Sequence, residues 1–222
     1  LPSYEEVKSV SIEALYVALR LGFEPEGRKS QYLGQFLQQN RRMVVFGDPG
    51  AGKSTLIRMI AYSLGREEPA PLAQILGRLV PIPIILRDYP VRLWDAPRDM
   101  LLDFSKTLAP EIPVEGTGEW LLDVLRSGRG VLMLDGLDEV GAPDDRKRLC
   151  DRVLTPLATE AGDSVILLTS RMTGDSAAPY DACGLRRCFL APFEEEEVRE
   201  YIRRWYAIRE PDRSRREQAV RL

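Results

Sequence analysis

Short apolar runs recur along the chain, and polar stretches with helical spacing separate them. These runs are residues 42–46, 79–89, 130–135, 164–170 and 186–190. Their side chains are apolar at successive positions, as in strands that are buried on both faces. The run 79–89 also contains Pro81 and Pro83, which predict an edge strand or an irregular first half. The runs therefore predict the strands of a covered sheet.

Helical periodicity fills most of the intervals between these runs. The predicted helices are residues 32–40, 52–64, 99–108, 118–127 and 144–161. The last of them should be interrupted near Pro156, because proline has no backbone N–H to donate. Residues 14–21 are apolar and fit either a strand or a helix, and residues 22–30 predict a loop. Strands that alternate with helices predict a parallel sheet covered by helices, which is the α/β class.

The composition changes after residue 192 and suggests a division of the chain into three parts. Residues 193–222 are dense in charge, with Val198, Tyr201, Ile202 and Trp205 at helical spacing. The parts are an N-terminal segment at 1–40, a core at 41–192 and the beginning of a helical subdomain at 193–222. The chain begins with leucine and stops within the charged pattern, so we expect it to be a piece of a longer protein.

Composition narrows the possible chemistry. The 222 residues are 44% hydrophobic and 29% charged, which is ordinary for a water-soluble domain, and the net charge of −3 predicts no general attraction to nucleic acid. No apolar run approaches the roughly 18 residues of a membrane span and no signal peptide is visible, so we expect a cytoplasmic protein. The chain has no histidine and three cysteines without paired spacing, which argues against zinc and against a serine–histidine arrangement. Any chemistry must therefore use carboxylates, lysine, arginine and a bound metal.

A glycine-rich turn with a lysine lies between the strand at 42–46 and the helix after it. It fits the pattern G-x-x-x-x-G-K-[ST], in the order Gly47, Asp48, Pro49, Gly50, Ala51, Gly52, Lys53 and Ser54, followed by Thr55. Glycines let successive backbone N–H groups face phosphate oxygens, and the positive end of the helix points at the same place. Lys53 adds a charge for the outer phosphates, and the Ser54 hydroxyl suits Mg²⁺. The alternative, a chance Gly/Lys loop, does not account for the strand and helix on either side.

Carboxylates follow the apolar run 130–135. Asp135 ends this run, at the edge of an α/β sheet where ligands bind, and could hold Mg²⁺ directly or through water. Asp138 and Glu139 come next and could orient a water for attack on a γ-phosphate. The alternative is an acidic surface turn. Asp138 also begins a D-x-x-G sequence, which is a motif of G proteins. Because Asp138 comes three residues after Asp135, and no guanine-reading N-K-x-D or T-K-x-D motif is present, the sequence argues against a small GTPase.

Polar residues also end the run 164–170. Thr169 and Ser170 lie where a polar side chain could sense a γ-phosphate or the attacking water, and Arg171 could pair with phosphate oxygens. The alternative for Arg171 is a surface arginine at the end of the sheet.

Taken in order, these segments resemble the NACHT family of signal-transducing P-loop ATPases, which includes animal inflammasome receptors and many bacterial defence proteins. The resemblance rests on FGDPGAGKSTLIR, VPIPIILRDY, VLMLDGLDEV, VILLTSR and FLAPFEEEEVREYIRRW, and it covers about residues 14–205. The most specific part is LDGLDE, in which a small residue follows the strand-terminal aspartate, unlike the related plant-type NB-ARC group.

The resemblance implies a three-layer α/β/α P-loop NTPase with a mainly parallel five-stranded sheet and the start of a C-terminal helical domain. By the same resemblance, residues 47–55 bind the phosphates of ATP or ADP, Lys53 acts on the outer phosphates, and Ser54 and Asp135 bind Mg²⁺. Asp138 and Glu139 then support hydrolysis, and Arg171 acts as the sensor. Tyr16 and Val17 become candidates for adenine contact. The segment Arg87–Asp88–Tyr89 also matches the family, without an assigned chemical role.

The function expected from this resemblance is a switch in which slow ATP hydrolysis controls the self-association of a larger signalling or defence protein. Other domains of that protein would sense an unknown ligand, and the winged helix that supplies a histidine in this family lies outside these 222 residues. One alternative is a dedicated P-loop ATPase, GTPase or phosphotransferase, which would need an acceptor site. Another is a non-catalytic nucleotide-binding module. The preference for adenine comes from the resemblance, because no base-reading motif is present.

Overall fold

The computed structural model describes residues 17–27, 29–66, 71–108, 116–172 and 183–209. The chain divides into two compact units. One unit is Arg20–Ala191, and the other combines Leu1–Leu19 with Pro192–Leu222. Each unit is described by itself.

The larger unit is built on a sheet whose strands, within the described residues, follow the order β2-β1-β7-β3-β6-β5-β4. Their bounds are β1 Arg20–Gly22, β2 Gln31–Tyr32, β3 Arg42–Phe46, β4 Val80–Ile85, β5 Gly130–Asp135, β6 Val165–Ser170 and β7 Arg186–Leu190. The strands β7, β3, β6, β5 and β4 are parallel. Strand β1 pairs antiparallel with β7 and with β2. The parallel five-stranded core is confirmed. The short strands β1 and β2 add to it: β1 begins within the run 14–21 that fits either a strand or a helix, and β2 was not predicted.

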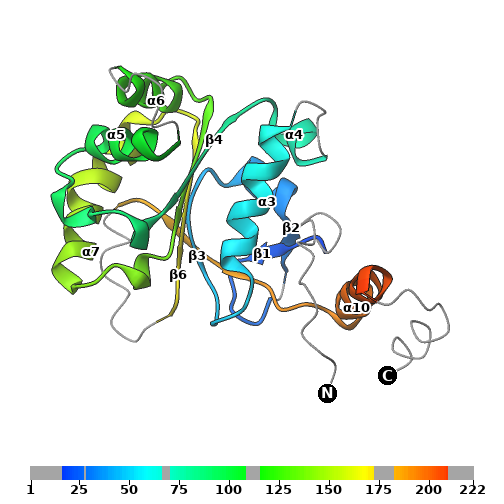
Figure 1. Cartoon of the computed structure of the whole chain (residues 1–222). Helices are drawn as coiled ribbons and strands as arrows, with labels where there is room; N and C mark the ends of the chain where they lie inside the picture. Colours follow the sequence, from blue (N-terminus) through cyan, green and yellow to red (C-terminus); the bar gives the residue numbers. More distant parts are fainter. Residues whose placement is uncertain (1–16, 28, 67–70, 109–115, 173–182, 210–222) are drawn as a thin grey trace. The chain divides into compact units, whose positions relative to one another are not determined.

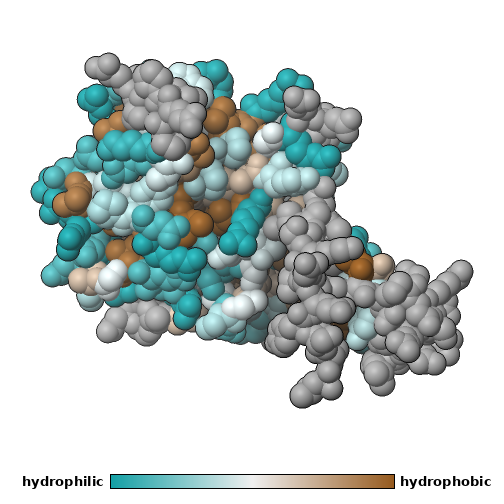
Figure 2. Space-filling model, in the orientation of Figure 1, coloured by the Kyte–Doolittle hydropathy of each residue, from teal (hydrophilic) through white to brown (hydrophobic). Residues whose placement is uncertain are grey.

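Helices cover both faces of this sheet (Figure 1). They are α2 Leu33–Gln39, α3 Lys53–Gly65, α4 Pro71–Leu76, α5 Pro97–Leu108, α6 Thr117–Arg126, α7 Pro143–Leu149 and α8 Thr155–Glu160. Figure 1 shows α3 and α4 on one side of the strands and α5, α6 and α7 on the other. Hydrophilic residues cover much of the outer face of the second group (Figure 2). This is the expected three-layer α/β/α arrangement.

Alternation along the strands decides which side chains face which helix layer. Leu132, Leu134 and Leu168 belong to the core cluster that includes side chains of α5 and α6. Successive residues of a strand point to opposite faces. Asp135 and Thr169 therefore point to the face covered by α3, which packs against β4 and β5. This pattern brings polar strand ends to the same side of the sheet as the glycine-rich turn.

Strand β4 lies at one edge of the sheet, as its prolines predict. The Val80 N–H donates to the Arg129 carbonyl at 2.8 Å, and β4 pairs only with β5 among the described strands. Alternate backbone groups of a strand point to opposite sides. The backbone nitrogens of Pro81 and Pro83 therefore point away from β5. Because they face the open edge, the lack of an N–H at these two positions costs no hydrogen bond between β4 and β5.

The predicted interruption near Pro156 is a widened turn between α7 and α8. Residues Cys150–Leu154 form a π-helical segment, and the Thr155 N–H donates to the Cys150 carbonyl, five residues back. A proline inside a helix lacks a donor and crowds the carbonyl four residues before it. The wider π turn just before Pro156 lets the chain stay helical through this position.

The smaller unit contains helix α10, Glu195–Arg209. It lies within residues 193–222, where the sequence predicts the beginning of a helical subdomain. The rings of Tyr201 and Trp205 stack with their centroids 6.4 Å apart. Throughout the described part of the chain, no helix combines the length and the apolar character that a membrane span requires.

Candidate functional site

The glycine-rich turn joins β3 to α3. Gly52 precedes the helix with φ +99°, and Gly50 has φ +80°. Both values lie in the left-handed region that residues with a Cβ rarely adopt, which explains glycine at these positions. An added Cβ on Gly47 would also lie 3.3 Å from the Ala51 Cβ. The three glycines therefore meet the backbone and packing requirements of this turn.

Lys53, the first residue of α3, folds back over the turn. Its Nζ donates to the Gly47 carbonyl at 2.6 Å and to the Asp48 carbonyl at 3.0 Å. Partial burial lowers the pKa of Lys53, while the carboxylates of Asp138 and Asp135 act in the opposite direction. A bound phosphate would favour the charged ammonium and offer it a stronger acceptor than these neutral carbonyls.

Asp135 is held by the neighbouring strand. The fully buried Thr169 hydroxyl on β6 donates to Asp135 Oδ1 at 2.5 Å and accepts a hydrogen bond from the Gly136 N–H at 2.9 Å. Asp135 itself is 8% exposed. Its carboxylate therefore has a fixed orientation and keeps one oxygen for another ligand. Thr169, which the sequence places where a polar side chain could sense a γ-phosphate or the attacking water, lines the same cavity as Asp135.

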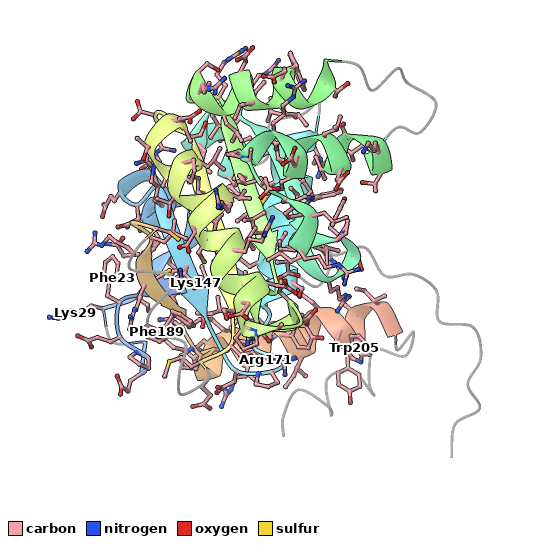
Figure 3. All side chains as sticks on the ribbon, turned by 90° about the vertical axis from the view of Figure 1, so that its left-hand side faces the viewer. Phe23, Lys29, Lys147, Arg171, Phe189 and Trp205 are labelled. Atoms are coloured by element: carbon pink, nitrogen blue, oxygen red, sulfur yellow. The ribbon has the colours of Figure 1, made fainter. Side chains whose placement is uncertain are left out.

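Asp138 is paired with the arginine predicted to be the sensor. The Arg171 backbone N–H donates to Asp138 Oδ1 at 3.0 Å, and the Arg171 Nε lies 3.0 Å from Oδ2. The Asp138 side chain is 10% exposed. Figure 3 labels Arg171, which directly follows β6. Both oxygens of the Asp138 carboxylate are thus engaged by one residue.

Glu139 is paired with an arginine from the other neighbouring strand. Arg87 lies in the 3₁₀ turn η1, Leu86–Asp88, directly after β4, and its Nη1 donates to Glu139 Oε2 at 3.0 Å. Glu139 belongs to a similar turn, η3, Leu137–Glu139, which directly follows Gly136. The sequence singled out Arg87 without a role; the missing information was that β4 pairs with β5, which brings these two turns together.

A cavity of about 230 Å³ brings most of these residues together. Its lining comprises Pro49, Gly50, Gly52, Lys53, Ser54, Thr55, Asp135, Gly136, Asp138, Glu139, Thr169 and Arg171. Gly47, Asp48 and Ala51 belong to the same turn but do not line the cavity. Tyr16 lies outside the described residues. Val17 belongs to the smaller unit, so its predicted adenine contact is not described.

The donor groups in this cavity suit a nucleoside polyphosphate with Mg²⁺. The turn and the start of α3 present backbone N–H groups, and Lys53 and Arg171 add positive charge. The Ser54 hydroxyl and the Asp135 carboxylate are hard oxygen donors of the kind that Mg²⁺ prefers, completed by water and phosphate oxygens. The residues present therefore fit both groups.

Comparison with known proteins gives one family match. The profile of the NACHT domain matches residues 41–208, which is most of the chain. A search of curated proteins returns no match.

Proposed function

This chain belongs to the NACHT family of nucleotide-binding P-loop NTPases, and we propose that it is a switch that binds ATP or ADP with Mg²⁺ and hydrolyses ATP slowly. The observation that carries the proposal is the shared cavity. The glycine-rich turn, the carboxylates after β5 and the arginine after β6 all line it. Phosphate binding and water activation need these groups within one space.

We propose these roles for the residues that line the cavity. The backbone of residues 47–55 and the Lys53 ammonium bind the phosphates, and Ser54 and Asp135 hold Mg²⁺. When bound, the metal would neutralise charge on the phosphate oxygens. Asp138 and Glu139 orient the attacking water. Arg171 leaves Asp138 to contact the terminal phosphate, which is present in ATP and absent from ADP.

The switch follows from this difference between ATP and ADP. A ligand shifts a conformational equilibrium only by the difference in its affinity for the two states. Lys53 now binds carbonyls of its own turn and Arg171 binds Asp138. An outer phosphate would compete for both cations. In the larger protein, ATP would favour a self-associating form and ADP would favour a closed monomer. Other domains of that protein would sense an unidentified ligand, and the whole protein would act in defence.

A thermal melt with ADP, ATP and GTP, each with and without Mg²⁺, tests the binding site. A ligand at about 100 times its dissociation constant adds about 2.7 kcal/mol to stability. For a domain of this size, that corresponds to a rise in melting temperature of about 5–11 °C. Lys53→Ala should lose the rise, and Lys106→Ala, a change of an exposed lysine on α5, should keep it. Equal shifts in both variants would contradict the assigned site.

Turnover measurements separate the switch from its alternatives. Glu139→Gln should retain ATP binding and lose hydrolysis, so ATP should persist on the protein. A non-catalytic module would show the same negligible turnover before and after this substitution. A dedicated enzyme would turn over many ATP molecules per second, and that result from this chain would contradict a slow switch.

A further inference from the structure

A second cavity, of about 240 Å³, shares one lining residue with the first. It is lined by residues of η1, of η2 (Val91–Leu93) and of the link between these two turns, by residues 139–141 after β5, and by Asp145 of α7. Glu139 lines both cavities. Arg87 and Arg92 line the second cavity and do not line the first. The residue proposed to orient water therefore lines both spaces, whereas its arginine partner lines only the second of them.

The two carboxylates after β5 are held very differently. Asp138 is nearly buried and receives two contacts from Arg171, one of them from the backbone. The Glu139 carboxylate contacts the Arg87 guanidinium through one oxygen, and the side chains of Glu139 and Arg87 are 33% and 57% exposed. Arg87 is also shared with Asp88, whose carboxylate lies 3.7 Å from its Nε. An ion pair this exposed contributes little and opens readily.

A backbone hydrogen bond holds Glu139 in its turn. Its N–H donates to the Gly136 carbonyl at 3.0 Å. Gly136 has φ +82°, and an added Cβ there would lie 3.2 Å from the Glu139 Cδ. The Glu139 carboxyl group therefore lies against a position without a side chain, and Gly136 lines the first cavity.

We propose that Arg87 is a positioning residue that holds Glu139 toward the second cavity and so keeps ATP hydrolysis slow. This inference rests on the proposed function. In the reaction, the water oxygen bonds to the γ-phosphorus and the bond to ADP breaks, with the electron pair leaving on ADP. One water proton stays on the phosphate, and the other passes through the Glu139 carboxylate to solvent. Release from Arg87 frees the second oxygen of Glu139, Oε2, and so makes the whole carboxylate available to orient that water.

The test compares steady-state hydrolysis by Arg87→Gln with that of the unchanged chain. The pair is exposed and single, so its loss should raise kcat by about two- to fivefold, as expected for opening a surface ion pair. KM for ATP should change by less than about twofold, because Arg87 does not line the nucleotide cavity. Arg87→Lys should restore most of the slow rate. Arg92→Gln, which removes a charge from the same second cavity, should leave kcat unchanged.

Two further measurements link the effect to Glu139. The gain from Arg87→Gln should vanish in a Glu139→Gln background. The kcat of the unchanged chain should rise between about 0.1 M and about 1 M salt, because salt screens exposed ion pairs, while the kcat of Arg87→Gln should rise less. If Arg87 had only a structural role, the effect of Arg87→Gln on kcat would not depend on Glu139, and the two chains would not differ in this way in the salt dependence of kcat.

The outcomes also separate this inference from the proposed function. If Glu139→Gln abolishes hydrolysis while Arg87→Gln leaves kcat unchanged or lowers it, the positioning role is wrong and the switch stands. If Glu139→Gln leaves hydrolysis intact, the role of Glu139 in the proposed function is wrong, and this inference fails with it. If the unchanged chain shows no turnover, gain of turnover in Arg87→Gln supports the inference and continued inactivity overturns it.

Discussion

Replacing Thr169 by valine should destabilise the larger unit, although the two side chains have nearly the same shape. The Thr169 hydroxyl is fully buried, donates to Asp135 at 2.5 Å and accepts from the Gly136 N–H at 2.9 Å. Valine leaves the buried N–H without its acceptor, which costs about 1–3 kcal/mol, and removes a hydrogen bond to a charged group. Asp135 borders the cavity, so water can replace part of the second loss. We expect a total loss of about 2–4 kcal/mol.

Urea denaturation is the appropriate assay, with the midpoint and the slope fitted separately. The midpoint should fall while the slope stays constant, because the variant exposes the same surface on unfolding. Thr159→Val is a matched control, since the Thr159 hydroxyl is exposed and donates only to the Thr155 carbonyl of its own helix, at 3.2 Å. A Thr169→Val loss within about 0.5 kcal/mol of the control would refute the reasoning that this hydroxyl holds Asp135 and the turn after it.

Two other predictions concern stability. Gly162→Ala should cost about 2–3 kcal/mol in chemical denaturation, because Gly162 has φ +50° and its Cβ would lie 2.7 Å from the Arg126 carbonyl oxygen; Gly141→Ala, where a Cβ meets open space, should change stability by less than about 0.5 kcal/mol. Burial raises the pKa of the Cys188 thiol from 9.0 to about 12, so above about pH 9 only the unfolded chain loses this proton and stability falls. Between about pH 8 and about pH 10, the unchanged chain should lose about 1.4 kcal/mol more than Cys188→Ala, and parallel pH curves would contradict this assignment.

Much of the local structure could be predicted from the sequence because its causes are local. The apolar runs at β3, β5 and β6 are buried at nearly every position, so strand and core coincide there. The pattern of glycines followed by Lys53 marks the turn into α3, and the structure places that turn beside the acidic residues after β5. The two-residue strand β2 is too short to show periodicity, and its second residue, Tyr32, falls at the start of the helix that the sequence predicts at 32–40.

The sequence by itself determined the five parallel strands, most of the helices, the α/β class and the residue types that gather in the cavity. Continuous apolar runs record strands that are covered on both faces, and a spacing of 3.6 residues records the covered side of a helix. Only the tertiary structure decided which elements are neighbours. Strand β6 lies between β3 and β5, so Thr169 reaches Asp135 across 34 positions of the chain. Strand β4 lies beyond β5, so Arg87 reaches Glu139 across 52 positions. Strand order arises from the packing of whole elements and their crossovers, and no short stretch of residues records it.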